Sequence, residues 1–324
     1  MQFAEALQYL LSLGHETLAI KLGLTNTERL LEALGDPQRT CFKVQLAGTN
    51  GKGSTAVMLD AITRAARIET ALYTSPHLVS ITERLRFNGQ DVDPLYFAYL
   101  TDRVKETAIR LRDAGGLSAL PTFFEHLTLM FLLACSEAQT EVAILETGLG
   151  GRLDATTAAE AELVAITPVA LDHQEYLGET LPEIAAEKAA IIRPGVTAVI
   201  APQAPEALRV ILKRCADCEV TPRVGECEVK VLGADETGRL RVTFETKTDR
   251  YENVRLSLRG RHQATNAAVA ISLAEALRER GWNIPNEAVV TGLEQSRHAG
   301  RLDLREGRPS LLFDGAHNAH GARA

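Results

Sequence analysis

The 324-residue sequence has little cysteine, and what it has does not form a recognisable disulfide or zinc pattern. Five cysteines are an odd number, which argues against a disulfide framework. Cys215-x-x-Cys218 has the spacing of half a zinc or redox site, but no second Cys or His pair completes it, and Cys215 continues a helical pattern. We therefore expect reduced, partly buried thiols.

Long apolar runs, a basic leader and an excess of positive charge are lacking too. The most apolar run, residues 127–135, is too short to cross a bilayer, and the N-terminus predicts a helix start rather than a signal peptide. The net charge is −7 and no basic cluster concentrates locally. We expect a cytoplasmic protein, a monomer, with no membrane and no nucleic-acid partner.

What is present is an ordinary globular composition with alternating strand and helix patterns. Hydrophobic residues make up 45% and charged residues 24%, and the length predicts two domains. Two helices are expected within the first forty residues. Strands are then expected at 44–47, 71–73, 142–145, 163–166 and 198–201, and helices at 52–66, 93–114, 123–138, 181–192 and 206–215. This order predicts an α/β fold with a mostly parallel sheet, helices on both faces and functional residues at the carboxyl ends of the strands.

The pattern changes after residue 220. Short strands at 227–232, 240–246 and 254–258, joined by polar turns, predict a small antiparallel β meander. Helices at 263–280 and 286–294 and two last strands at 302–305 and 310–313 complete the expected elements.

Residues 44–55 have the layout of a phosphate-binding loop. An apolar strand ends in a Gly-rich turn, and a helix begins at its lysine. Lys52 can reach the outer phosphates, and Ser54 or Thr55 can contact phosphate or Mg²⁺. The match to G-x-x-x-x-G-K-[ST] is imperfect because Gly53 delays the hydroxyl by one residue, so an ordinary strand–helix connection is the alternative. The predicted nucleotide contacts of the loop are Thr49, Asn50, Gly51, Lys52, Gly53 and Ser54.

The sequence Gly-Thr-Asn-Gly-Lys-Gly-Ser at 48–54 resembles the loop of the Mur ligase superfamily, and most closely that of folylpolyglutamate synthase and dihydrofolate synthase. Later segments match the same family in the same order. They are Ser75-Pro76-His77-Leu78, Thr122-Phe123-Phe124-Glu125, the run from Glu146 to Ala155, Leu171-Asp172-His173, Glu187-Lys188-Ala189, His262-Gln263-Ala264-Thr265-Asn266-Ala267, Gly300-Arg301 and Asp314-Gly315-Ala316-His317-Asn318. The resemblance covers nearly the whole chain.

The resemblance implies ATP-dependent amide formation with ATP and Mg²⁺ as cofactors. A carboxylate of dihydropteroate or a folate attacks the γ-phosphate, and the amine of L-glutamate then displaces phosphate from the acyl phosphate. It also implies a Mur-ligase-type ATP-binding domain over residues 1–297, with the N-terminal helices. Residues 298–324 would be a linker and the first strand of a Rossmann-like glutamate-ligase domain. We expect a C-terminally truncated fragment that binds ATP and is itself inactive as a ligase.

In the family, the positions of Ser75, Glu146 and His173 hold magnesium, and the position of Lys188 carries a carbamate. We therefore take Lys188 and His173 as the catalytic candidates. Lys188 lies on the apolar face of its predicted helix, where desolvation lowers a lysine pKa and favours the neutral amine that carbamylation needs. The alternatives are that Ser75 is a turn residue before proline, that His173 is only hydrogen-bonded, and that Lys188 extends its amine to solvent.

Further positions match family contacts to ATP and to the pterin substrate. Asn266, Arg301 and Asp314 match ATP-binding positions. The substrate candidates are Leu24, within the stretch Lys21-Leu22-Gly23-Leu24, together with Thr122, Leu153, Asp154 and Ala155. The alternatives are a polar helix residue for Asn266, helix N-caps for Asp314 and Thr122, and a turn residue for Asp154.

Two rival functions stay open on the sequence alone. A peptidoglycan-type Mur ligase normally has a separate N-terminal domain for its UDP-sugar, and only about forty residues precede the loop here. A nucleotide-binding protein without ligase activity is the rival from a different class.

Overall fold

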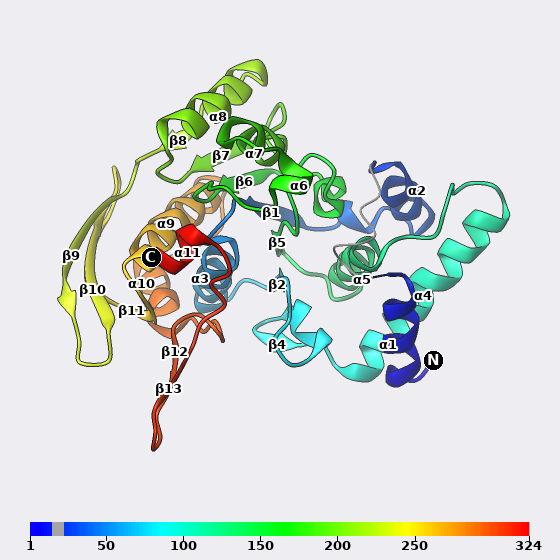
Figure 1. The fold of residues 1–324 in the computed structure, drawn as a ribbon, viewed down its shortest axis with the longest axis horizontal. Coiled ribbons are helices and arrows are strands. Elements are labelled where there is room, and N and C mark those ends of the chain that lie inside the picture. Colours follow the sequence, from blue (N-terminus) through cyan, green and yellow to red (C-terminus); the bar gives the residue numbers. More distant parts are fainter. Residues whose placement is uncertain (15–22, 324) are drawn as a thin grey trace.

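The computed structural model describes residues 1–14 and 23–323, and its centre is an eight-stranded sheet (Figure 1). The strand order is β4–β3–β2–β5–β1–β6–β7–β8. The strands are β1 (Phe42–Ala47), β2 (Thr70–Tyr73), β3 (Leu85–Phe87), β4 (Gln90–Asp91), β5 (Val142–Glu146), β6 (Leu163–Ile166), β7 (Thr197–Ile200) and β8 (Arg223–Val224). Neighbouring strands pair in parallel along the run β2–β5–β1–β6–β7–β8. The strands β3 and β4 add an antiparallel edge.

The predicted fold class is confirmed, with three strands added. All five strands expected before residue 220 are present, within two residues at either end. The strands β3, β4 and β8 were not predicted. Each spans only two or three residues, which is too short for an alternating pattern to stand out.

Side chains that alternate along the strands give the sheet two buried faces. Val44 and Leu46 pack into a core with α3 (Lys52–Ala65), α9 (His262–Glu279) and α10 (Asn286–Gln295). The opposite face of the sheet is covered in two parts. One is formed by α1 (Phe3–Ser12), α2 (Thr25–Ala33), α4 (Pro94–Asp113) and α5 (Phe123–Glu137), and the other by α7 (Leu181–Ala189) and α8 (Pro205–Asp217).

Polar side-chain caps set the starts of three predicted helices, α4, α5 and α7. Asp93 caps α4 and is not part of it, so the expected start at residue 93 was one residue early. The Thr180 hydroxyl caps α7 by accepting the Glu183 N–H, and the Glu183 carboxylate accepts the Thr180 N–H, in the capping box that the sequence predicts. The expectation that this helix continues to residue 192 was wrong, since α7 ends at Ala189. The short elements α6 (Gln174–Leu177), η1 (Pro37–Arg39), η2 (Ile81–Arg84) and η3 (Ala155–Ala159) were not predicted.

The predicted meander is confirmed as β9 (Glu228–Ala234), β10 (Arg239–Glu245) and β11 (Arg250–Arg259), an antiparallel sheet of order β11–β10–β9. It lies on the outer side of α9 and α10 (Figure 1). The strands β12 (Asp303–Arg305) and β13 (Leu311–Phe313) pair in an exposed hairpin before α11 (Ala319–Arg323). The domain boundary at residue 297 stays a prediction. Over the described ranges, no helix has the length and apolar character needed to cross a membrane.

Candidate functional site

One cavity of about 910 Å³ lies at the carboxyl ends of the central strands. Its walls come from segments far apart in the sequence, including the loops after β1, β2, β5 and β6 and residues 301–322. It brings together every predicted site residue except Leu24. The predicted residues that line it are Thr49, Asn50, Gly51, Lys52, Gly53, Ser54, Ser75, Thr122, Glu146, Leu153, Asp154, Ala155, His173, Lys188, Asn266, Arg301 and Asp314.

The loop between β1 and α3 has a conformation that depends on glycine. Gly51 is the N-cap of α3 with φ +91°, in the left-handed region. A Cβ at Gly51 would collide with the Oδ1 atom of Asn266, which belongs to α9. The Lys52 amine lies over this turn and donates to the carbonyls of Gly48 at 3.2 Å and Thr49 at 3.4 Å. The loop therefore places the lysine and the start of α3 at the mouth of the cavity.

Of the two hydroxyls that the sequence left as alternatives, Ser54 lines the cavity and Thr55 does not. Ser54 Oγ accepts a hydrogen bond from Gln263 Nε2 at 3.3 Å and lies 3.3 Å from His298 Nδ1. Gln263 in turn accepts from Asn266 Nδ2 at 2.9 Å. Gln263 and His298 do not line the cavity, but both contact Ser54, and sequence reasoning did not single out these contacts. Gln263 stands in a matched segment beside Asn266, whereas nothing in the sequence singles out His298.

Glu146 is the last residue of β5 and is 6% exposed. Its Oε2 atom accepts the Ser75 backbone N–H at 3.1 Å, so the two predicted metal ligands after β2 and β5 are in contact. Burial raises the pKa of Glu146, while the charge of Lys52 and the Ser75 hydrogen bond oppose this rise. A buried carboxylate facing one lysine at the carboxyl edge of the sheet is suited to a hard cation.

Lys188 has the burial that its position on the apolar helix face predicts. The residue is 4% exposed, and its amine donates to the Gly48 carbonyl at 2.9 Å. Burial, together with the positive charge of Lys52, lowers the pKa of Lys188 to about 7. The prediction of an inward-facing lysine is confirmed, and the alternative of a lysine extended to solvent is wrong.

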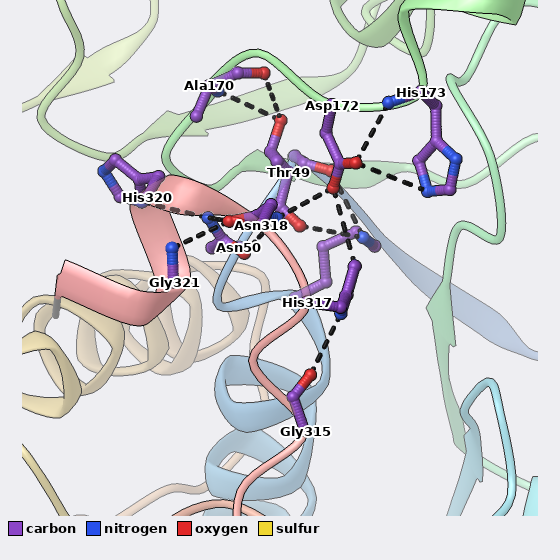
Figure 2. A network of polar contacts seen from close by, with 12 residues as sticks. Thr49, Asn50, Ala170, Asp172, His173, Gly315, His317, Asn318, His320 and Gly321 are labelled. Carbon is purple, nitrogen blue, oxygen red and sulfur yellow. Dashed lines mark hydrogen bonds and ion pairs between the residues drawn. The ribbon is translucent and has the colours of Figure 1, made fainter.

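His173 does not lie beside Glu146 in the sheet order. It comes after β6, and β1 separates β6 from β5. Ser75, Glu146 and His173 thus lie at or after the ends of β2, β5 and β6, and only β2 and β5 are adjacent strands of the sheet. His173 is the N-cap of α6 with φ +49°, and its half-exposed ring faces Asp172 and His317 (Figure 2).

The C-terminal residues close one side of the cavity. Asp314 accepts the backbone N–H groups of Leu302 at 2.8 Å and Ala316 at 2.7 Å, so its carboxylate also fixes the turn that follows β13. Asn318 exchanges hydrogen bonds with Asn50 of the phosphate loop at 3.2 and 3.3 Å. The expectation that Asp314 caps a helix was wrong, because α11 begins at Ala319.

The predicted substrate residues also have local structural roles. Thr122 is the N-cap of α5, as its alternative predicts. Asp154 accepts the N–H groups of Leu149 at 2.9 Å and Thr156 at 3.0 Å and caps η3. Leu24 immediately precedes α2 and is not among the cavity-lining residues. Lys21 and Leu22 lie outside the described residues.

A parallel sheet with a glycine-dependent loop, a lysine and a buried carboxylate at its carboxyl edge defines a nucleotide-binding protein of the phosphate-loop class. Residues 46–274 match the Mur ligase middle domain. A relative from Bacillus subtilis, "Dihydrofolate synthase/folylpolyglutamate synthase", is 35% identical over 95% of this chain and 72% of its own length. The chain belongs to the folylpolyglutamate synthase/dihydrofolate synthase family of Mur ligases.

Two further comparisons are consistent with this family. A "Probable bifunctional folylpolyglutamate synthase/dihydropteroate synthase" of Halobacterium salinarum is 36% identical over 98% of this chain, and the chain spans only 38% of that relative's length. The solved structure of "Mycobacterium tuberculosis Folylpolyglutamate synthase complexed with ADP" superposes with a TM-score of 0.89 at 32% identity, covering 98% of this chain and 72% of the other.

Proposed function

We propose that the chain binds ATP–Mg²⁺ as the nucleotide-binding part of an amide ligase that adds L-glutamate to dihydropteroate, to folates or to both. The observation that carries the proposal is the cavity that all but one of the predicted site residues line. Family membership supports the reaction class, and the ADP bound by the Mycobacterium tuberculosis relative supports the nucleotide.

In this proposal, residues 49–54 and Lys52 in particular hold the phosphates of ATP. Backbone N–H groups at the start of α3 favour an anion, and the Lys52 amine is a point charge close to them. Asn266 lies against Gly51, and Arg301 lines the cavity as a further cation. Asp314 would accept a ribose hydroxyl with the lone pairs that its two backbone contacts leave free.

The Glu146 carboxylate and the Ser75 hydroxyl are donors that fit a magnesium ion. His173 lines the same cavity and would be a further ligand. When bound, Mg²⁺ would neutralise phosphate charge during attack by the substrate carboxylate. The protein's own part is to hold Glu146 ionised and in place. The Lys52 charge and the Ser75 N–H do this against the effect of burial.

Lys188 would act as a carbamate in this site. A pKa of about 7 leaves much of the amine neutral at physiological pH, which is the form that adds CO₂. The new anion would be formed close to Lys52 and the phosphate loop, since the Lys188 amine already contacts the Gly48 carbonyl. There it would offset positive charge and supply oxygen ligands for a cation.

The pterin part of the substrate would bind against Thr122, Leu153, Asp154 and Ala155, which line the same cavity. Asp154 is buried and has backbone N–H partners already, so it would orient this wall as well as contact a ligand. The substrate role of Leu24 stays a prediction, and Leu24 does not line the cavity.

The test of the proposed reaction is phosphate release from ATP by the full natural protein, measured with dihydropteroate or a folate. We expect release to require the pteroate substrate and L-glutamate together. Release with a UDP-sugar peptide acceptor alone would favour the peptidoglycan-type rival. Nucleotide binding with no release in any mixture would favour a binding protein without ligase activity.

A further inference from the structure

The hydroxyl group of Ser54 is contacted by two side chains that do not themselves line the cavity. Gln263, on α9, donates from Nε2 to Ser54 Oγ at 3.3 Å. His298, in the segment between α10 and β12, brings Nδ1 to 3.3 Å from the same atom. Ser54 and Gln263 are buried, and His298 is partly buried. The proposed function assigns no role to His298.

The hydrogen bonds fix the direction in which Gln263 acts on Ser54. Gln263 Oε1 accepts from Asn266 Nδ2 at 2.9 Å, so the amide nitrogen of Gln263 is the group that faces Ser54. A hydroxyl group has one hydrogen and two lone pairs. The Gln263 N–H occupies one lone pair, which leaves the Ser54 hydrogen and the second lone pair for His298 and the cavity.

The state of His298 decides which of these two faces the cavity. An Nδ1 atom with a lone pair accepts the Ser54 hydrogen, and the second lone pair of Ser54 is then directed to the cavity. An Nδ1 atom with a hydrogen donates to that lone pair instead, and the Ser54 hydrogen turns to the cavity. Desolvation and the charge of Arg301 lower the pKa of His298 to about 3, so the ring is neutral and can offer a lone pair.

The charges around the cavity favour the first arrangement. Lys52 and Arg301 both line the cavity, and the magnesium ion proposed above would add further positive charge. A hydroxyl hydrogen directed toward these cations would be repelled, whereas an oxygen lone pair is attracted to them. A Ser54 lone pair is therefore the better group to face the cavity.

His298 also lies close to the carboxylate that would bind magnesium. The position that a Cβ on Gly53 would take is 2.8 Å from His298 Cε1 and 3.2 Å from Glu146 Oε2. The imidazole ring and the carboxylate therefore pack against the same residue of the phosphate loop, one position before Ser54. A side chain in this place can set the direction of the Ser54 hydroxyl relative to an ion at Glu146.

We propose that His298 is a positioning residue, which accepts the Ser54 hydroxyl hydrogen and so directs a Ser54 lone pair at the cation bound with ATP. Gln263 completes the arrangement by donating to the other lone pair. Hard cations bind oxygen lone pairs, and the partners that orient a ligating group influence the affinity for the ion. The inference rests on the proposed function, because it needs an ATP-bound cation near Glu146.

The first experiment measures the ATP affinity of the 324-residue chain with Mg²⁺ and with EDTA. His298→Leu removes the acceptor, and we expect it to lower the affinity with Mg²⁺ about tenfold and to leave the affinity with EDTA unchanged. His298→Asn should retain most of the affinity, because its Oδ1 atom is as many bonds from the backbone as Nδ1 of histidine and can accept the same hydrogen. The control is Arg297→Ala, at the exposed neighbouring residue, which should bind ATP–Mg²⁺ as the parent does.

A double-mutant cycle separates positioning from a merely structural role. In a Ser54→Ala background, His298→Leu should cause no further loss of affinity, because the hydroxyl that it orients is gone. An equal loss in the parent and Ser54→Ala backgrounds would overturn the proposal. A loss of the same size with EDTA as with Mg²⁺ would overturn it too.

The second experiment needs no nucleotide, so it distinguishes a failure of this inference from a failure of the proposed function. In the ¹⁵N NMR spectrum of the nucleotide-free chain, we expect His298 to show an Nδ1 without hydrogen and an Nε2 with one. Ser54→Ala should shift the Nδ1 signal, and loss of both signals in His298→Asn assigns them. A hydrogen on Nδ1 would overturn the proposal whether or not ATP–Mg²⁺ binds. The expected spectrum without ATP–Mg²⁺ binding would contradict the proposed function and still support the direction of the hydrogen bond from Ser54 to His298.

Discussion

Two buried groups of opposite charge type, Glu146 and Lys188, are both affected by the charge of Lys52. The Lys52 charge opposes the rise of the Glu146 pKa that burial causes, and it adds to the lowering of the Lys188 pKa. One lysine thus favours an ionised carboxylate and a neutral amine at the same time. This combination suits the proposed site, in which Glu146 would bind a cation and Lys188 would form a carbamate.

The role of Glu146 as a magnesium ligand is tested by Glu146→Gln. We expect ATP affinity measured with Mg²⁺ to fall by at least about 1.5 kcal/mol, the scale of a lost charged contact. Affinity measured with EDTA should be unchanged. Because burial raises the pKa of Glu146, the ionised group costs stability at neutral pH, and the nucleotide-free variant should be no less stable than the parent. An equal loss with and without Mg²⁺ would contradict the assignment.

The carbamate on Lys188 is tested by its pH dependence. At a fixed partial pressure of CO₂, the carbamate signal in ¹³C NMR should grow as pH rises through about 7, because deprotonation of the amine precedes addition. Lys188→Met should lose this signal. Lys213→Met, at a lysine 74% exposed and paired with Asp217, should keep it. A spectrum that is the same for the parent and Lys188→Met would rule the carbamate out.

At the scale of the element, the junction between β1 and α3 depends on the space above Gly51. Gly35 is a matched control, since it has nearly the same φ, +90°, with nothing within 4 Å of an added Cβ. Either alanine should cost about 1–2 kcal/mol for the left-handed conformation. Only Gly51→Ala should also weaken ATP–Mg²⁺ binding, because its Cβ displaces Asn266 and with it the loop. Urea unfolding and nucleotide titration of both variants measure this, and equal nucleotide affinity would contradict it.

The elements that the sequence predicted are those with long periodic patterns or clear caps. The strands β1, β2, β5, β6 and β7 each carry an apolar run, and Thr180 and Glu183 mark the start of α7. The short strands β3, β4 and β8 escaped prediction because two or three residues show no period.

The residues of the site likewise divide into those that a local pattern predicts and those that it does not. Residues on strand ends and in the Gly-rich loop were predicted, as was the inward direction of Lys188. The contacts of His298 with Ser54, and of His317 with Asp172, depend on how distant segments pack, and no local pattern reports that. Leu24 does not line the cavity, and its substrate role, which the resemblance alone suggests, stays a prediction.

At the scale of the whole molecule, the meander and the nucleotide site share one hydrophobic core. The cluster that contains Val44 and Leu46 of β1 also contains Phe244 of β10, which is fully buried. Phe244→Ala should therefore lower the free energy of unfolding of the whole chain by about 3–5 kcal/mol. Phe313→Ala, at a phenylalanine 51% exposed, should change it by less than about 0.5 kcal/mol.

Urea denaturation followed by tryptophan fluorescence measures both variants, since Trp282 packs against the same core. A separate early transition for the meander, with the main transition unmoved in Phe244→Ala, would show that the two regions unfold independently.

Nucleotide binding by the phosphate loop is tested most directly by titrating the 324-residue chain with ATP–Mg²⁺, comparing the parent with Lys52→Ala and with the surface control Lys213→Ala. We expect one nucleotide per chain for the parent and the control. For Lys52→Ala we expect a loss of about 1.5–3 kcal/mol in binding free energy, with an unchanged urea midpoint in the absence of nucleotide. Equal affinity in all three proteins would contradict the assignment of residues 48–54 as the phosphate site.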